Sequence, residues 1–314
     1  MPSIELNGLT KKFGSLTAVD HLSITVEEGE VFGLLGPNGA GKTTTLRMLA
    51  CLISPSEGSA KVGGYDIVND SQRVRGIVGL LTENPSLYER LTVYENLDFF
   101  AEAYGLIDPR ERRVTIKELL DYFDLGEKRN EKAGKLSKGM KQKLAIARTL
   151  VHKPPILFLD EPTAGLDPES AKGIRDLIAS LSQRQNHTVL LCTHHLEDAE
   201  KLCRRVMIIN RGRSVIAGTF EELQNKIGGK TNLQITLKKL RPSIIDAVKS
   251  VKEVKEVHVN EEQGTITITV DDSMNSTPEI VKKIVGAEGS VLSVNILRPS
   301  LEETYLKLVR EDHS

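Results

Sequence analysis

Few local patterns limit a fold as strongly as an apolar strand that runs straight into a glycine-rich loop, and residues 31–43 have both. Residues 31–35 form a continuous apolar run, which is typical of a strand buried on both faces of a parallel sheet. Residues 36–43 then match G-x-x-x-x-G-K-[ST], and we predict a helix over residues 44–52. This succession predicts a loop whose backbone N–H groups, with the helix N-terminus, bind phosphate oxygens. The alternative is a glycine-rich turn that binds nothing.

The loop offers the groups that a nucleoside triphosphate requires. Lys42 can reach the β- and γ-phosphates, and the Thr43 hydroxyl can ligate Mg²⁺. We therefore expect ATP contacts from nine consecutive residues: Gly36, Pro37, Asn38, Gly39, Ala40, Gly41, Lys42, Thr43 and Thr44.

A second apolar run ends in two carboxylates. Residues 156–159 are apolar and are followed by Asp160 and Glu161. In an α/β sheet the ligand lies at the carboxyl ends of the strands. We therefore expect Asp160 to face Mg²⁺ and Glu161 to act on the water that attacks the γ-phosphate. Alone, the pair is equally compatible with the start of an ordinary loop.

Composition limits the classes of function. The 314 residues correspond to two domains at about 150 residues each. The net charge of −1 argues against nucleic acid as the main partner, because duplex binding usually requires a basic excess. Three cysteines without a C-x-x-C pair favour reduced thiols. No apolar run approaches the roughly 18 residues that span a bilayer and no signal peptide is recognised, so we expect any membrane role to act through a partner.

The loop and the two carboxylates together predict a nucleotide hydrolase, and residues 136–143 narrow its kind. They read Leu-Ser-Lys-Gly-Met-Lys-Gln-Lys, open a predicted helix, and resemble the LSGGQ signature of ATP-binding cassette (ABC) ATPases. The resemblance implies that Ser137 and Gly139 contact the γ-phosphate held by the opposite subunit. By itself the segment is also compatible with a capped amphipathic helix.

Other motifs of this family are present on both sides of this segment, in the order expected for the family. Phe13 matches the aromatic residue that stacks on adenine, and Glu83 occupies the position of the Q-loop glutamine. Residues 164–167 resemble the D-loop and include Asp167. His194, rather than neighbouring His195, matches the switch histidine. The resemblance covers residues 1–228 and implies Glu161, His194 and Lys42 as catalytic residues and Thr43, Glu83 and Asp160 as the metal-binding set.

Three positions depart from the family pattern. Glu83 replaces glutamine, so a carboxylate lies near the metal and repels the γ-phosphate. Lys138 replaces the first signature glycine, and Met140 replaces its glutamine. Lys138 either attracts phosphate or points to solvent. Similar variants occur among ATPases of ABC-2-type exporters, which also tend to carry a small C-terminal domain.

The resemblance implies an ATPase subunit that forms a head-to-tail homodimer around two ATP molecules with Mg²⁺. Its partner is expected to be a transmembrane permease subunit on a separate chain, with no nucleic acid partner, and the analogy with ABC-2-type ATPases implies an exporter. The subunit would then be cytoplasmic and peripheral on the cell membrane. The alternative is a non-transport ABC ATPase in DNA repair or translation, but the long coiled coil, zinc motif or second cassette typical of such proteins is absent from the sequence.

The predicted fold class is α/β, a P-loop NTPase of ABC type with an inserted helical subdomain at about residues 87–150. The nucleotide-binding domain is expected over residues 1–228, with Asn7-Gly8 as a turn. The order strand-helix-strand-strand-helix-strand predicts a ferredoxin-like α+β domain over residues 229–314, with Pro278 opening its second helix and a final helix at residues 300–308. This domain either dimerises or packs, or it binds a small effector.

Overall fold

The computed structural model describes residues 2–226, 231–261, 263–270 and 273–297, and it separates the chain into two compact units. Unit 1 is Met1–Phe220 and unit 2 is Glu221–Ser314. Helix α8 (Phe220–Lys226) begins at the last residue of unit 1. The predicted domain boundary between residues 228 and 229 falls outside the described residues and stays a prediction.

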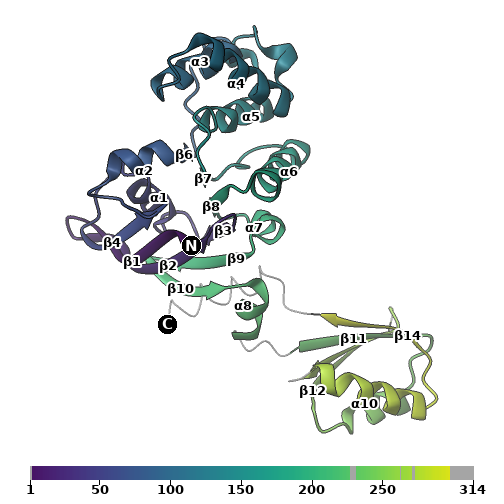
Figure 1. The fold of residues 1–314 in the computed structure, drawn as a ribbon. Helices are drawn as coiled ribbons and strands as arrows, with labels where there is room; N and C mark the ends of the chain where they lie inside the picture. The colour runs from purple at the N-terminus through teal and green to yellow at the C-terminus, as the bar shows by residue number, and fades with distance from the viewer. Residues whose placement is uncertain (1, 227–230, 262, 271–272, 298–314) are drawn as a thin grey trace. The chain divides into compact units, whose positions relative to one another are not determined.

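A six-stranded sheet forms the centre of unit 1 (Figure 1). Its order is β10-β9-β3-β8-β7-β6; the strands from β9 to β6 run parallel, and β10 is antiparallel to β9. Strands β3, β7 and β8 are buried along their whole length, as strands covered on both faces must be. The α/β fold class is confirmed. The strands are β3 (Val31–Leu35), β6 (Val78–Leu81), β7 (Ile156–Asp160), β8 (Thr188–Thr193), β9 (Arg205–Asn210) and β10 (Arg213–Gly218).

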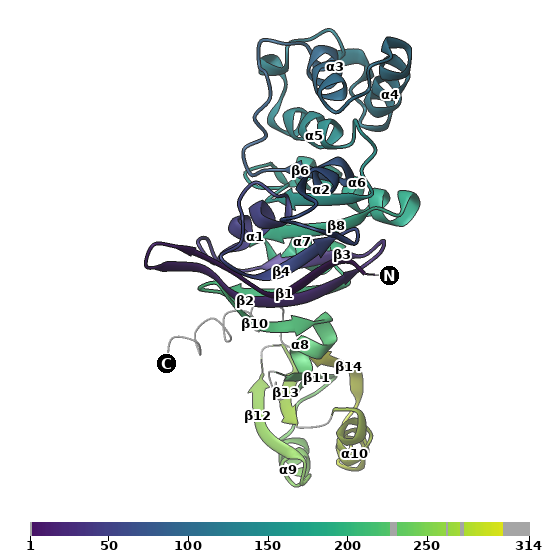
Figure 2. The same ribbon diagram turned by 60° about the vertical axis from the view of Figure 1, so that its left-hand side comes forward.

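A second, antiparallel sheet in the order β2-β1-β4-β5 lies over helix α1 (Lys42–Leu49) (Figure 2). Helix α1 contacts β2 and β4 on one side and β7 and β8 on the other, so it is sandwiched between the two sheets. Leu46 of α1 shares one buried core with Leu6 and Phe158. The strands are β1 (Pro2–Phe13), β2 (Leu16–Glu27), β4 (Glu57–Val62) and β5 (Tyr65–Asp66).

The predicted turn at Asn7-Gly8 is wrong, because β1 continues through both residues. Its pairing with β2 shifts register between Leu6 and Leu9, and Gly8 has a φ of +59°. The segment is therefore a β-bulge, which glycine accommodates without a Cβ penalty. Pairing with strands on both sides keeps β1 extended where a local reading favours a turn.

Helices α3, α4 and α5 gather beyond the β6 edge of the central sheet (Figures 1 and 2). A capping box of Thr92 and Glu95 starts α3, and Asp108 followed by Pro109 starts α4. Helices α6 and α7 follow the carboxyl ends of β7 and β8. The helices are α2 (Ser71–Ile77), α3 (Val93–Ala103), α4 (Pro109–Tyr122), α5 (Lys138–Thr149), α6 (Pro168–Gln185) and α7 (Leu196–Leu202), with 3₁₀ turns at Gly126–Lys128 and Ala133–Lys135.

Unit 2 contains an antiparallel sheet in the order β12-β13-β11-β14. Helices α9 and α10 contact each other, and their apolar residues share one buried core with β11 and β13. Pro278 does not open α10 but lies inside it. The predicted helix at residues 300–308 lies outside the described residues. The elements are β11 (Thr231–Leu237), α9 (Pro242–Lys249), β12 (Val254–Asn260), β13 (Thr265–Val270), α10 (Ser273–Gly286) and β14 (Val291–Leu297).

Candidate active site

The glycine-rich loop connects β3 to α1 and is closely packed against backbone. A Cβ on Gly36 would lie 2.4 Å from the Ile209 carbonyl oxygen, and one on Gly41 would lie 2.5 Å from that of Ala18. Gly41 has a φ of +106°, which side chains rarely adopt. The helix begins at Lys42 rather than at residue 44, because the Gly41 carbonyl already accepts a helical hydrogen bond from the Thr45 N–H at 2.9 Å. The glycines thus fix the loop geometry.

Lys42 lies inside this loop with its ammonium group buried. Nζ donates to the carbonyl oxygens of Gly36 at 2.6 Å and Pro37 at 3.2 Å, and it lies 3.5 Å from Glu161 Oε1. The loop lines a pocket of 380 Å³ together with residues of three other segments: Ala18, Pro37, Asn38, Gly39, Ala40, Gly41, Lys42, Thr43, Thr44, Glu83 and Glu161. The structure therefore brings Lys42, Glu83 and Glu161 together.

Asp160 carries an unsatisfied oxygen beside the loop. Thr43 Oγ1 donates to Asp160 Oδ2 at 2.8 Å, whereas Oδ1 is buried without a hydrogen-bond partner. Burial raises the pKa of Asp160, and repulsion by Glu161 and Glu83 acts in the same direction, against the Thr43 hydrogen bond and Lys42. A hydroxyl and two carboxylate oxygens beside a phosphate-sized loop fit a hard divalent cation such as Mg²⁺.

Glu161 combines a strained backbone conformation with three contacts to its side-chain carboxylate. Its φ is +49°, a region unusual for a non-glycine residue. The Thr193 hydroxyl donates to Oε2 at 3.1 Å, and His194 Nδ1 lies 2.8 Å from Oε1. With Lys42 on the same oxygen, these contacts aim the buried carboxylate at the loop. Of the two adjacent histidines, His194 is the one that contacts Glu161, and Thr193 is a contact that sequence reasoning missed.

The position of His195 near this carboxylate was also not predicted from the sequence. Donor atoms of Glu161, His194 and His195 lie within 4.8 Å of one another, a grouping compatible with a metal ion. The ammonium of Lys42 is only 3.5 Å from the shared Glu161 oxygen, so its charge opposes a second cation there. The grouping is explained without a metal, as a hydrogen-bonded carboxylate and imidazole.

Four of the predicted contact residues belong to other segments than the glycine-rich loop and do not line its pocket. Ser137 begins α5 and accepts a hydrogen bond from the Met140 N–H at 3.3 Å, and Asp167 does the same for Ser170 at the start of α6. Gly139 lies against Ser170. Phe13 is half exposed at the end of β1, with the Lys11 ammonium 5.0 Å from its ring. Within one copy of the chain these residues are structural caps or surface groups.

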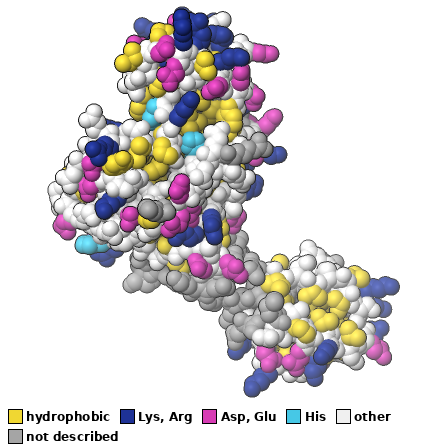
Figure 3. Space-filling view, viewed as in Figure 1, with side chains coloured by type: hydrophobic (Ala, Val, Ile, Leu, Met, Phe, Trp, Pro, Cys, Tyr) yellow, Lys and Arg dark blue, Asp and Glu magenta, His cyan; other side chains and the backbone are white. Residues whose placement is uncertain are grey.

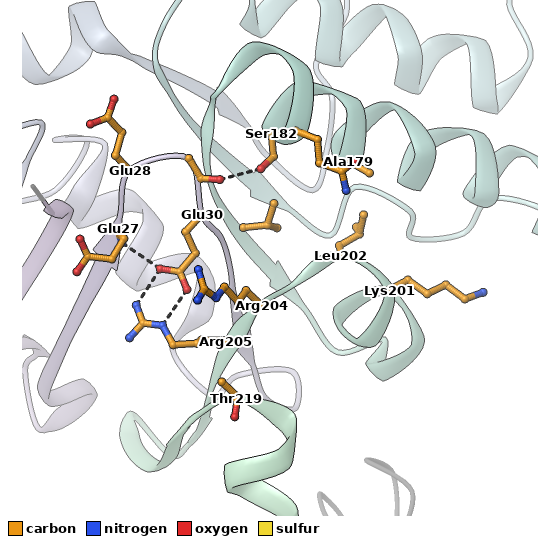
Figure 4. Close-up of a pocket in the computed structure, with 13 residues that line it drawn as sticks. Glu27, Glu28, Glu30, Ala179, Ser182, Lys201, Leu202, Arg204, Arg205 and Thr219 are labelled. Atoms are coloured by element: carbon orange, nitrogen blue, oxygen red, sulfur yellow. Dashed lines mark hydrogen bonds and ion pairs between the residues drawn. The ribbon is translucent and has the colours of Figure 1, made fainter.

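Two other charged features of unit 1 contain ion pairs. A pocket of 390 Å³ lies beside the start of β3 (Figure 4), where Glu30 accepts two hydrogen bonds from Arg205 at 2.8 Å each. Lys and Arg side chains also gather over the end that carries α3 and α4 (Figure 3), where Arg112 pairs with Asp98 at 2.9 Å. Paired groups of this kind define no second catalytic site.

Comparison with known proteins gives consistent matches. Residues 19–164 match the family described as "ABC transporter", and residues 218–309 match "ATP-binding protein DrrA1-3-like, C-terminal domain". The linearmycin resistance ATP-binding protein LnrL of Bacillus subtilis is 33% identical over 305 residues, 97% of each chain. The bacitracin transport ATP-binding protein BcrA of Bacillus licheniformis is 34% identical, over 98% of this chain and 97% of its own.

Unit 1 also resembles solved structures. One is a dimeric post-hydrolysis state of the ATP-binding cassette MJ0796 bound to ADP and Pi. It is 28% identical with a TM-score of 0.62, and the match covers 69% of this chain and 98% of that one. In the described part of this chain, no helix has the length and apolar character needed to cross a membrane.

Proposed function

This chain belongs to the ABC transporter family, and from that membership we propose that two copies sandwich two ATP molecules head to tail and drive a separate membrane permease. The chain is an ATP-binding and ATP-hydrolysing subunit of an ABC transporter. What is proposed is the role of each residue, the metal, the dimer and the partner. The observation that carries the proposal is that Lys42 and Glu161 line one glycine-rich pocket while Asp160 accepts a hydrogen bond from Thr43 of the same loop.

ATP binding is assigned to the loop and to Lys42. The backbone N–H groups of residues 38–44 and the start of α1 face a triphosphate, and the Lys42 ammonium exchanges its loop carbonyls for β- and γ-phosphate oxygens. Thr43 and Asp160 hold Mg²⁺, with the unpartnered Asp160 Oδ1 as the free ligand atom and Glu83 at the edge of the same pocket. When bound, this ion neutralises charge that develops on the phosphates.

Hydrolysis is assigned to Glu161 and His194. Glu161 orients the water that attacks the γ-phosphate and accepts its proton at a carboxylate oxygen. Lys42, Thr193 and His194 hold that carboxylate in place. The side chain therefore needs little rearrangement when the nucleotide binds. His194, whose Nδ1 lies 2.8 Å from Glu161 Oε1, is assigned the contact with the γ-phosphate.

The dimer supplies what one copy lacks. Ser137 and Gly139 do not line the loop pocket of their own chain, which agrees with contacts to nucleotide held by the opposite copy. Phe13 stacks on adenine and Asp167 belongs to the same interface. Cleavage of the γ-phosphate removes contacts made only in the closed state, so the dimer opens.

The transported compound is proposed by analogy. Relatives carry names such as linearmycin resistance and bacitracin transport ATP-binding protein. We infer that this chain likewise powers export of an antibiotic-like compound and lies on the cytoplasmic face of the membrane, bound to its permease. The relatives favour transport over the alternative of DNA repair or translation.

Glu161→Gln tests the catalytic assignment. The amide cannot accept a proton, so ATP turnover should fall at least about 100-fold while ATP binding persists. The uncleaved γ-phosphate should then hold the dimer together. Steady-state turnover and size-exclusion chromatography with light scattering, with and without ATP and Mg²⁺, measure both effects.

The matched control is Glu28→Gln. It removes an exposed carboxylate in the turn before β3, at the opposite end of the strand from the glycine-rich loop, and ATP turnover should be unchanged. Normal hydrolysis by Glu161→Gln would show that the carboxylate role is wrong. A chain that neither binds ATP nor dimerises would contradict the proposed function as a whole.

A further inference from the structure

Lys138, the residue that departs from the family signature, makes a specific contact with a distant loop. Its Nζ donates to the Gly165 carbonyl oxygen at 2.6 Å, across 27 positions in the sequence. Gly165 has a φ of +65°, and a Cβ there would lie 2.5 Å from the same ammonium. The lysine therefore lies directly against the backbone of residues 162–167, which follow Glu161.

A second side chain of α5 is hydrogen-bonded to the same loop. Gln142 lies four positions after Lys138, hence on the same helix face, and its Nε2 donates to the Pro162 carbonyl oxygen at 2.7 Å. The start of α5 is also tightly packed on α6, because a Cβ on Gly139 would lie 2.5 Å from Ser170 Oγ. The loop is thus held at both ends, by a buried amide and by an exposed ammonium group.

The positive end of the α5 dipole favours a Lys138 conformation that points away from its own helix. Lys138 is the first helical residue, and the first turn holds no acidic side chain. A cation there is disfavoured by the positive end of the helix dipole. Lys141, in the same turn, pairs instead with Glu89 at 2.9 Å. Two lysines at one helix start therefore have different partners, and only Lys138 reaches the loop.

We propose that Lys138 is a positioning residue that fastens residues 162–167 to the start of α5 and so couples the two nucleotide sites of the dimer. The inference rests on the proposed function. Ser137 and Gly139, on either side of Lys138, face the nucleotide of the opposite copy. The loop gripped by Lys138 begins at Glu161, which acts on the nucleotide of the same copy. A contact made at one site is thereby transmitted to the hydrolytic carboxylate of the other.

Hydrogen exchange of the nucleotide-free full chain tests the contact itself. Lys138→Met removes the ammonium but keeps the aliphatic stem. Peptides covering residues 162–167 should then exchange up to about tenfold faster, the value of one lost hydrogen bond. Lys138→Arg retains a donor and should restore protection. Lys141→Met, the matched neighbour, should leave this loop unchanged.

Turnover tests the coupling. In Lys138→Met, kcat at saturating Mg²⁺-ATP should fall about five-fold or more, with loss of any cooperativity in ATP and little change in KM. Lys138→Arg should recover kcat. In the Glu161→Gln background, ATP-dependent dimer assembly should be unaffected by Lys138→Met, because Ser137 and Gly139 remain.

The outcomes separate the inference from its alternatives. Unchanged exchange of residues 162–167 in Lys138→Met, checked with Lys138→Leu as a second variant without a donor, overturns the contact whether or not the chain hydrolyses ATP. Unchanged kcat overturns the coupling. Loss of dimer assembly in the Glu161→Gln background overturns it in favour of a direct ammonium–phosphate contact. Because Lys138 is exposed, none of these variants depends on rebuilding the core.

Discussion

Two buried carboxylates lie beside one buried lysine at the glycine-rich loop, and their excess of negative charge determines which ions can bind there. Asp160, Glu161 and Lys42 are all nearly inaccessible to solvent. Glu83 at the pocket edge adds to the repulsion that, with burial, raises the pKa of Asp160. A triphosphate brings several more negative charges into the same volume, and one ammonium group cannot balance them. This charge balance supports the proposed divalent cation beside Asp160, independently of any sequence motif.

His152 provides a test of how burial controls charge elsewhere in unit 1. Its ring stacks on Tyr104 at 3.8 Å, Nε2 contacts the Val78 carbonyl, and Nδ1 is buried without a partner. Burial lowers the pKa of His152 below its usual value. As the pH falls, His152 is therefore protonated in the unfolded chain at a higher pH than in the folded chain. The stabilisation that is present above about pH 6.5 is lost as the pH falls below that value.

We expect unit 1 to lose more unfolding free energy between pH 7.5 and 5.5 in the native chain than in His152→Gln. The variant itself should be about 1 kcal/mol less stable at pH 7.5, because the ring stacking is lost. Urea unfolding at both pH values measures the difference. His258→Gln, which replaces an exposed histidine of unit 2, should behave like the native chain. Equal pH slopes for native and His152→Gln would refute the prediction.

Helices α6 and α7 are tied to the loop that follows β7 by a buried ionic cluster. Asp198 of α7 accepts hydrogen bonds from Thr163 in that loop and from Arg175 of α6, the latter at 2.8 Å. Both oxygens of the buried carboxylate are thus satisfied. Because α7 begins directly after His194 and His195, the cluster fixes the helix that positions the histidine against Glu161. Such a cluster cannot be recognised in the sequence, since its members belong to three elements.

The elements around the pocket were predictable where their signals are local. The apolar runs of β3 and β7 and the glycine pattern between β3 and α1 depend on neighbouring residues only, and these elements are confirmed. Asn7-Gly8 was misread because two flanking strands decide its conformation. The contact of Lys138 with Gly165 was not foreseen, because proximity across 27 positions follows from packing of α5 on α6.

Gly41→Ala tests how far the loop geometry depends on glycine. Gly39 and Gly41 both have positive φ, of +80° and +106°, but a Cβ at Gly39 meets nothing within 4 Å, whereas one at Gly41 strikes the Ala18 carbonyl. Without nucleotide, Gly41→Ala should therefore lose about 1–3 kcal/mol more unfolding free energy than the matched Gly39→Ala. Urea unfolding measures both; equal losses would mean that the contact with β2 does not constrain the loop.

The whole chain combines two units with separate cores. Buried apolar residues of unit 1 and of unit 2 form distinct clusters. Every described residue that lines the loop pocket belongs to unit 1. The match to a DrrA-like C-terminal domain over residues 218–309 assigns unit 2 to a family but not to a role. On these grounds we expect nucleotide chemistry to belong to unit 1. That unit 2 dimerises, packs or binds a small effector stays a prediction.

A chain ending at residue 228 tests this division of labour. It should fold, bind ATP with an affinity within about twofold of the full chain, and retain Mg²⁺-dependent turnover, since independent parts contribute additively. Isothermal titration with Glu161→Gln in both chain lengths measures binding, and light scattering measures dimer assembly. The matched piece, residues 229–314, should show cooperative unfolding by circular dichroism because it has its own core. If the shortened chain is folded but cannot bind ATP, unit 2 takes part in the nucleotide site; if only dimer assembly weakens, unit 2 belongs to the dimer interface.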